Sequence, residues 1–164
     1  MNIFHELYEL YLRVNSYCVM AKYKLMYPHH IKTIGKYYFR KGLILMAEGN
    51  ITIGRRVFFN NFCSVNSKNN IFIGDDCIFG ENVRIYDHNH LFDVDNNYII
   101  SGFTSAPIHI GNHCWISSNC TILKGVSIGE NCIIGAGCVV YKDIPSNTVV
   151  INNQNLRFKQ NAIK

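Results

Sequence analysis

Cysteine and histidine are the residue types of this 164-residue chain whose spacing could indicate a chemical role, as metal ligands, disulfide partners or catalytic groups. Four cysteines and a histidine lie within the stretch HCWISSNCTILKGVSIGENCIIGAGC, which runs from His113 to Cys138. Structural zinc sites gather their ligands at one point and commonly contain close pairs such as C-x2-C. Neighbouring cysteines of this stretch are six or twelve residues apart. The spacing therefore does not favour zinc, and we expect no metal.

A second set of candidate groups consists of Asp87, His88 and His90 in the segment IYDHNH. The unperturbed pKa of histidine is about 6.5, so a neutral imidazole can take a proton from a reacting hydroxyl near neutral pH. Asp87 or a backbone carbonyl could fix the tautomer of such an imidazole. The segment therefore contains candidates for general-base catalysis.

The elements that must position these residues follow from a six-residue repeat. Cut from Ile110, the sequence divides into IGNHCW, ISSNCT, ILKGVS, IGENCI, IGAGCV and VYKDIP, and the same period begins at Ile53 and at Ile73. A branched apolar residue opens most blocks, and Gly often comes second, where we expect a corner. This period fits neither an amphipathic helix nor a simple hairpin. It is typical of a coil with three short faces whose successive turns pair as parallel strands, which predicts an all-β solenoid.

The repeat places most of the cysteines at one equivalent position. Six of the seven are the fifth residue of their blocks, which is Val57, Val83 and Val126 elsewhere. Buried free cysteine packs as a small hydrophobic residue, and a chain without an export signal is expected to keep its thiols reduced. Cys18 lies outside the repeat. We predict core packing for the other six: Cys63, Cys77, Cys114, Cys120, Cys132 and Cys138.

The same patterns divide the chain into segments. Residues 1–28 place apolar side chains at three- and four-residue spacing and predict an amphipathic helix. We expect this helix to cap the open end of the solenoid, whose first coil has no preceding neighbour; contact with a membrane surface or a partner is the less favoured alternative. Residues 29–151 form the predicted β-helix domain with a loop at 91–109, and residues 152–164 form a polar, basic tail. Loops of this length are usually functional.

Composition narrows the classes of function. Hydrophobic residues make up 48% and charged residues 16% of the chain, which indicates a globular protein. The net charge of +5 is mild, so we expect no nucleic-acid partner, whereas nucleotide phosphates suit this charge. No apolar run approaches the ~20 residues of a membrane span, and the N-terminus lacks the pattern of a secretory signal. These observations predict a cytoplasmic location.

The hexads and the stretch FTSAPIHIGNHCWISSNCTILKGVSIGENCIIGAGCVVYKDIP resemble the hexapeptide-repeat acyltransferases, and are similar to the galactoside and maltose O-acetyltransferases. The resemblance covers roughly residues 34–151 and implies a left-handed parallel β-helix. It also implies a homotrimer with active sites between subunits, and a loop from Leu91 that reaches towards a neighbouring subunit. The implied reaction transfers an acetyl group from acetyl-CoA to a hydroxyl of a sugar or glycan precursor, as in polysaccharide biosynthesis.

The resemblance also implies catalytic roles for individual residues. The catalytic histidine of the sugar O-acetyltransferases stands at the sixth place of the hexad before the loop. That place is His90 here, with His88 as the second choice and Asp87 as a candidate to orient the imidazole. The backbone N–H of Ser118, on the coenzyme side of the site, matches the donor that stabilises the oxyanion of the tetrahedral intermediate. No covalent enzyme intermediate is needed, so the cysteines require no catalytic role.

Coenzyme- and substrate-binding positions follow from the resemblance in the same way. Trp115 matches a Trp that lines the coenzyme groove, Ala136 an Ala whose backbone contacts the pantetheine arm, and Lys142 a Lys near the coenzyme phosphates. Tyr141 stands where Thr is common, and Asn60 corresponds to an acceptor-binding Asn. After the last coil the family usually continues G-N-P-A-K, whereas this chain has INNQNLRFK. The turn over the coenzyme therefore differs.

Three alternatives remain open at this point. A zinc hydratase of the γ-carbonic anhydrase type shares the fold, but its second and third ligands should be five residues apart, and His109 and His113 are four apart. A non-catalytic β-helix scaffold would explain the repeat, but not the D-H-N-H segment beside a long loop. An N-acetyltransferase acting on an amino-sugar would use the same fold, although such relatives often carry an additional N-terminal domain.

Overall fold

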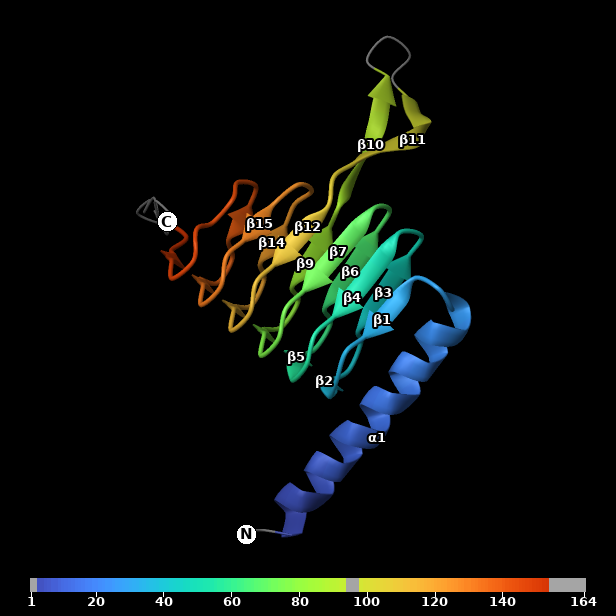
Figure 1. The fold of residues 1–164 in the computed structure, drawn as a ribbon, viewed down its shortest axis with the longest axis vertical. Coiled ribbons are helices and arrows are strands. Elements are labelled where there is room, and N and C mark those ends of the chain that lie inside the picture. Colours follow the sequence, from blue (N-terminus) through green and yellow to red (C-terminus); the bar gives the residue numbers. More distant parts are fainter. Residues whose placement is uncertain (1–2, 94–97, 154–164) are drawn as a thin grey trace, which may run out of the picture.

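The computed structural model describes residues 3–93 and 98–153 of the chain. A long helix, α1 (Ile3–Met26), precedes a solenoid of short parallel strands, and a hairpin projects from the solenoid (Figure 1). Of the predicted tail 152–164, all but the first two residues lie outside the described part of the chain.

The solenoid has three faces, each a parallel sheet to which successive coils contribute one strand. Face 1 consists of β1 (Ile31–Thr33), β4 (Asn50–Ile53), β7 (Asn70–Ile73), β12 (Ile108–Ile110) and β15 (Ser127–Ile128). Face 2 consists of β2 (Tyr37–Phe39), β5 (Val57–Phe59), β8 (Ile78–Phe79), β13 (Trp115–Ile116), β16 (Ile133–Ile134) and β18 (Val149–Val150). Face 3 consists of β3 (Ile44–Ala47), β6 (Ser64–Ser67), β9 (Arg84–Tyr86), β14 (Thr121–Ile122) and β17 (Val139–Val140). We call the edges between these faces corner 1–2, corner 2–3 and corner 3–1. The three parallel sheets confirm the predicted all-β solenoid.

Successive coils stack in register. Ile31 pairs with Ile51 and Ile51 with Ile71, so the first coils repeat every twenty residues. Ile71 then pairs with Ile108, although the hairpin lies between them in the sequence. The insertion therefore leaves the register of the solenoid unchanged.

Glycine at the second position of the hexad is required by the close approach of the next coil. A Cβ on Gly54 would lie 2.6 Å from the carbonyl carbon of Gly74, so no side chain fits there. The expected corner conformation falls two residues later instead, where Arg56, Asp76 and His113 adopt positive φ values of 54°, 58° and 57°. The prediction that these glycines lie near a corner is confirmed. The reason differs, because glycine is needed for the close stacking of the next coil and not for a positive φ.

The inward side chains form a dry core in columns along the solenoid axis. Phe59 stacks on Phe79 with ring centroids 4.5 Å apart, and the six repeat cysteines are all buried, which confirms their predicted packing. Their thiols also contact the next coil: Sγ of Cys63 lies 3.1 Å from the carbonyl oxygen of Gly80, and Sγ of Cys114 lies 3.1 Å from that of Gly129. Cysteine therefore fills the position and donates a weak hydrogen bond that valine cannot.

Helix α1 packs one face against the first coil, at the N-terminal end of the solenoid (Figure 1). Ser16 Oγ accepts a hydrogen bond from the backbone N–H of Phe39 at 2.7 Å, and the hydroxyl of Tyr23 donates to the carbonyl of Leu43 at 2.9 Å. Met20 joins the core. These contacts pair backbone groups that a first coil leaves open. The domain boundaries at residues 28 and 151 stay predictions.

The segment 91–109 contains most of an antiparallel hairpin rather than an irregular loop. Strand β10 (His88–Asp93) pairs with β11 (Tyr98–Ser105), with a register shift between His90 and Leu91. A segment that projects from the solenoid cannot use the coil-to-coil ladder, so pairing with itself satisfies its backbone. Among the described residues, no helix is long and apolar enough to cross a membrane.

The cysteine arrangement predicts the reactivity of the thiols. Cys18 is exposed, whereas the six repeat cysteines are buried and their sulfurs are out of reach of a reagent. Burial also raises the pKa of the Cys63 thiol to about 11, while the hydrogen bond with Cys77 lowers the pKa of Cys114, so burial is what protects the six thiols. Iodoacetamide should therefore label one cysteine of the native protein quickly and all seven after denaturation, as mass spectrometry would show. Cys18→Ser should abolish the fast reaction. Fast labelling of several repeat cysteines would contradict the buried columns.

Candidate active site

The carboxylate of Asp87 organises the point where the chain leaves face 3 and enters the hairpin. Asp87 is fully buried. Its oxygens accept hydrogen bonds from Ser67 Oγ and from the backbone N–H groups of Lys68 and Asn69, each at 2.8 Å. A buried carboxylate is tolerated only when donors replace the lost water. These donors come from the preceding coil, so Asp87 ties the start of the hairpin to corner 3–1.

His88 is the imidazole that contacts this carboxylate. Its Nδ1 lies 3.1 Å from Oδ1 of Asp87, and its side chain is 14% exposed. The ring meets Phe103 of β11 edge-on, at 5.2 Å between centroids. A proton on Nδ1 directed to Asp87 would leave Nε2 as the basic nitrogen. Of the two predicted histidines, Asp87 therefore contacts His88, and its orienting role stays a prediction.

His90 lies beside His88 but is held differently. Its ring packs at 4.6 Å and 50° against Phe103, and the residue is exposed at the base of the hairpin. Asp87 makes its imidazole contact with His88 and not with His90. The three predicted catalytic residues are therefore brought together: Asp87 is buried, His88 is largely covered and His90 is exposed.

A cleft of about 390 Å³ opens beside the two histidines. Lys68 lines this cleft and forms an ion pair with Glu48. Its Nζ lies 4.0 Å from the ring centre of Phe103. Oδ1 of Asn66 is buried without a hydrogen-bond partner among the described residues, so it is an unsatisfied acceptor in the wall of the cleft. The cleft is lined by Met46, Glu48, Asn66, Ser67, Lys68, Tyr86, His88, His90 and Phe103.

Several residues of this cleft were not predicted from the sequence. Glu48 and Lys68 hold equivalent corner positions twenty residues apart, and the next coil brings Asp87 to the same corner. The common register of successive coils is the signal that could have found them. Phe103 could not be found in this way, because it reaches the site through the hairpin.

The predicted coenzyme residues do not lie beside the histidines. Trp115 is half-exposed on face 2. Ser118 and Ala136 follow strands of face 2 at corner 2–3, where Asn60 also lies. The hydrogen bonds of Ser118 run through its Oγ, which accepts from the N–H of Glu81 at 3.2 Å, and through its carbonyl oxygen. Face 3 separates this group from Asp87 and the histidines.

Tyr141 and Lys142 belong to the other corner. They follow β17 at corner 3–1, which is also the corner of the hairpin, but they lie in a later coil. The ammonium group of Lys142 lies 5.4 Å from the ring centre of Tyr141. The predicted site therefore divides within one chain into a histidine group and a Trp115–Ser118–Ala136 group on different corners.

The other histidines considered for a zinc site lie apart from this cleft. His109 stacks on Phe72 at 4.7 Å, and His113 Nδ1 lies 3.7 Å from a carboxylate oxygen of Asp76. Within residues 3–93 and 98–153, no group of three or more His, Cys, Asp or Glu side chains could hold a metal ion.

Comparison with known proteins connects this geometry to a protein family. Residues 107–142 match the family described as bacterial transferase hexapeptide (six repeats). The polysialic acid O-acetyltransferase of Escherichia coli O1:K1 is 39% identical over 127 residues, which are 75% of this chain and 41% of the relative. The maltose O-acetyltransferase structure from Clostridium difficile 630 aligns with a TM-score of 0.61 and 35% identity, over 73% of this chain and 64% of that one. The structure of galactoside acetyltransferase in complex with coenzyme A has a TM-score of 0.65 and 32% identity, over 72% and 58% of the two chains.

These likenesses confirm the predicted resemblance and the predicted fold. The chain is a left-handed parallel β-helix of hexapeptide repeats, similar to the galactoside and maltose O-acetyltransferases. It spans about half the length of the curated relatives it matches, 41% and 55% of two of them.

The hydrogen bonds of Asp87 predict a large effect of a small substitution. In Asp87→Asn, the amide group would place N–H donors against the backbone N–H of Asn69 or Ser67 Oγ, so at least one bond is lost. We expect the free energy of unfolding to fall by about 3 kcal/mol, measured by urea denaturation. The control is Asp143→Asn, where an exposed carboxylate accepts one backbone N–H at 2.7 Å. Equal losses in the two variants would show that burial of Asp87 carries no special weight.

Proposed function

We propose that the protein transfers an acetyl group from acetyl-CoA to a hydroxyl of a sugar or glycan precursor. The supporting observation is the cleft at corner 3–1, where two histidines and a buried carboxylate meet. The chain's likeness to sugar O-acetyltransferases, one of them solved with coenzyme A, supports the same chemistry. A cleft lined by polar side chains suits an alcohol-rich ligand.

In the proposed reaction, His90 acts as the general base. Its imidazole takes the proton of the acceptor hydroxyl while the hydroxyl oxygen attacks the thioester carbonyl carbon. The backbone N–H of Ser118 stabilises the oxyanion of the tetrahedral intermediate. The C–S bond then breaks, the coenzyme thiolate takes the proton from the imidazolium, and the acetyl ester and free coenzyme leave. Asp87 anchors the base of the hairpin through its hydrogen bonds, and His88 gives the cleft a polar wall.

We propose that the active site is completed by a second copy of the chain. His90 lies at corner 3–1, whereas Trp115, Ser118 and Ala136 lie on face 2 and at corner 2–3. A rotation about an axis parallel to the solenoid can bring one copy's corner 3–1 against its neighbour's corner 2–3. Repeating that contact closes a ring if the rotation closes, and we propose the homotrimer that the resemblance to the sugar O-acetyltransferases implies.

The acceptor would bind along the wall formed by Asn66, Lys68 and Glu48. Oδ1 of Asn66 is buried without a partner in the described part of the chain, and a turn of this side chain towards the cleft would let it accept a hydrogen bond from a sugar hydroxyl. The Lys68–Glu48 pair offers both a donor and an acceptor at the rim. We also propose a cytoplasmic location, because the seven cysteines are all free and suit a reducing compartment.

The roles of the two histidines can be separated by substitution. We expect His90→Ala to lower kcat by about 10²–10⁴-fold, because the proton of the attacking hydroxyl loses its acceptor. His88→Ala should have a smaller effect, since its ring supports the cleft from a largely covered position. The measurement is thiol release from acetyl-CoA over a panel of sugars and amino-sugars, with His109→Ala as the matched control.

The outcomes distinguish the competing functions. A larger loss in His88→Ala than in His90→Ala would assign the base to the Asp87–His88 pair. Acetylation of amino-sugars alone would establish an N-acetyltransferase. No thiol release with any acceptor, together with no binding of coenzyme A, would favour a scaffold and overturn the proposal.

Mixed assemblies test whether two chains share each site. His90→Ala and Trp115→Ala should each be weakly active alone, because one removes the base and the other a coenzyme contact. Co-expressed, they should regain activity at about one quarter of the sites, where an intact His90 of one chain meets an intact Trp115 of another. Co-expression of His90→Ala with His88→Ala is the control, since these changes affect the same corner. No gain in the first mixture would place the whole site on one chain.

A further inference from the structure

Positive charge is concentrated at the N-terminal end of the solenoid. Residues 10–47, which cover most of α1 and the first coil, contain seven Lys and Arg and no Asp or Glu. The remainder of the chain contains nine basic and eleven acidic residues. With Glu6, Glu9 and Glu48 included, residues 1–48 carry a net +4 of the chain's +5, so this end attracts polyanions in a directed way.

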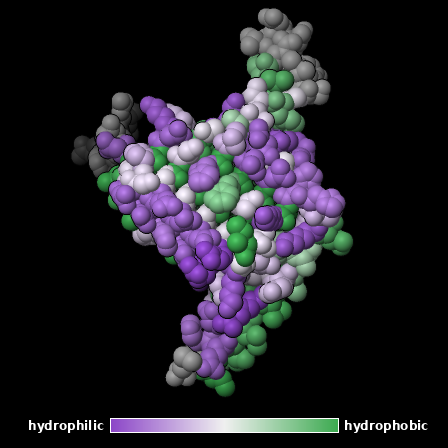
Figure 2. Space-filling model, in the orientation of Figure 1, coloured by the Kyte–Doolittle hydropathy of each residue, from purple (hydrophilic) through white to green (hydrophobic). Residues whose placement is uncertain are grey.

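The same end exposes a broad apolar face. The side of α1 opposite its buried face has apolar residues at three- and four-residue spacing, which forms a continuous stripe along a helix. Leu7, Val14 and Leu25 are 57%, 55% and 84% exposed. Figure 2 shows hydrophobic residues along the outer edge of this helix. We call this the outer stripe, and it consists of Leu7, Leu10, Tyr11, Val14, Cys18, Ala21 and Leu25.

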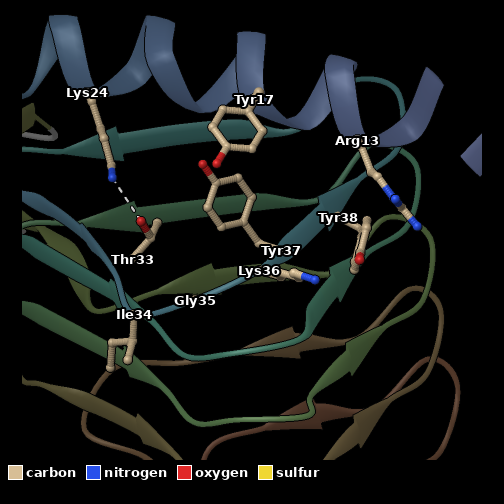
Figure 3. Close-up of a pocket in the computed structure, with 9 residues that line it drawn as sticks. All are labelled: Arg13, Tyr17, Lys24, Thr33, Ile34, Gly35, Lys36, Tyr37 and Tyr38. Carbon is tan, nitrogen blue, oxygen red and sulfur yellow. Dashed lines mark hydrogen bonds between the residues drawn. The ribbon is translucent and has the colours of Figure 1, made fainter. Parts of the chain in front are cut away.

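A basic cleft of about 490 Å³ lies next to the outer stripe, between α1 and the turn from β1 to β2 (Figure 3). Arg13 and Lys24 of α1 line it from one side and Lys36 of the turn from the other, and no carboxylate is among the lining residues. Lys24 donates a hydrogen bond to Oγ1 of Thr33 at 2.8 Å. Three cations and no carboxylate among its lining residues make this cleft suited to an anionic group.

Tyrosine hydroxyls complete the cleft. The rings of Tyr17 and Tyr37 are 6.2 Å apart and tilted by 41°, and Figure 3 shows their hydroxyls directed towards one another. Burial raises the pKa of Tyr37 above its usual value, and the nearby Tyr17 raises it further. The Tyr37 hydroxyl therefore stays protonated at neutral pH and can donate to an anion.

We propose that the outer stripe and the basic cleft together dock the protein on a membrane surface rich in anionic phospholipid. The outer stripe enters the boundary between headgroups and acyl chains, as amphipathic helices do. The cleft takes a lipid phosphate between Arg13, Lys24 and Lys36. The contact is peripheral, and it leaves the cleft at corner 3–1 open, because the hairpin projects from a different part of the solenoid (Figure 1).

The charges beside the outer stripe favour a lipid surface over a second copy of this helix. Arg13 and Lys24 flank it on one side and Lys22 on the other, so two such helices packed in parallel would bring like charges into contact. Anionic headgroups neutralise all three. Tyr11 and Tyr17, with an apolar ring and a polar tip, also suit the membrane–water boundary.

The proposed trimer would strengthen this docking without new contacts. In a homotrimer with parallel solenoids, the three α1 helices lie at the same end and their outer stripes face one plane. Three weak membrane contacts then act together, which raises the overall affinity well above that of one helix. A glycan precursor carried by the same membrane would be presented to all three active sites.

Vesicle flotation of the full-length protein tests the proposal. Wild type should bind vesicles of equal parts phosphatidylcholine and phosphatidylglycerol, bind phosphatidylcholine alone weakly, and be released by high salt. Leu7→Ser with Val14→Ser should weaken binding about tenfold or more. Arg13→Gln with Lys36→Gln should weaken it by about fivefold for each cation.

Matched controls remove equivalent groups elsewhere. Val149→Ser with Ile151→Ser removes exposed apolar side chains at the far end of the solenoid, and Arg84→Gln with Lys124→Gln removes two cations outside residues 10–47; both should bind like wild type. Circular dichroism checks that each variant is folded, and thiol release with a water-soluble acceptor should be unchanged in all four. Equal binding to neutral and anionic vesicles, or no binding, would overturn the proposal. So would a stripe variant that dissociates an assembly of the wild type, because a second copy would then cover the stripe.

Discussion

In-register stacking of parallel coils is the constraint on which the rest of the structure depends. Each coil buries its branched apolar residues and pairs its backbone only with the coils before and after it. Equivalent positions therefore form columns, as the isoleucines of face 1 do from Ile31 to Ile108. A residue in a column must fit its neighbours in the column as well as its own coil. This is why glycine stays at the second position, where the next backbone passes within Cβ distance.

A structure built in this way can change only at its corners, and corner 3–1 shows how. The hairpin leaves after Asp87 and returns at Ala106, whose N–H donates to the Asp87 carbonyl at 2.9 Å. The exit and the return are thus hydrogen-bonded to one another, and the next coil stacks as if nothing intervened. The buried carboxylate holds the exit against the preceding coil. The same carboxylate contacts His88, so the group that permits the insertion also shapes the cleft beside it.

Features that repeat with the six-residue period could be predicted from the sequence, whereas features formed between coils or outside the repeat could not. The six-residue period was sufficient for the solenoid and for the six buried cysteines, because a periodic burial pattern has one structural solution. The first coil, β1 to β3, lacks the hexad signature, since α1 supplies part of its packing through Met20 and Tyr23. The wall of Glu48 and Lys68 was missed because it forms across coils, between residues twenty positions apart. The contact of Asp87 with His88 could not be predicted either, because it depends on how two side chains are directed at a corner, which residue spacing does not determine.

The shape of the fold also explains why its functional surfaces lie apart. A three-faced prism is convex, and side chains on different corners point away from each other, so one chain cannot gather them around a ligand. A deep site needs either an insertion, such as the hairpin that brings Phe103 over the histidines, or a second body against a face. The N-terminal end has such a second body in α1, and the cleft at Tyr17 and Tyr37 forms where the helix and the coil part. The two clefts therefore have the same geometric origin. Each forms where an element outside the repeat, the hairpin or α1, packs against the solenoid.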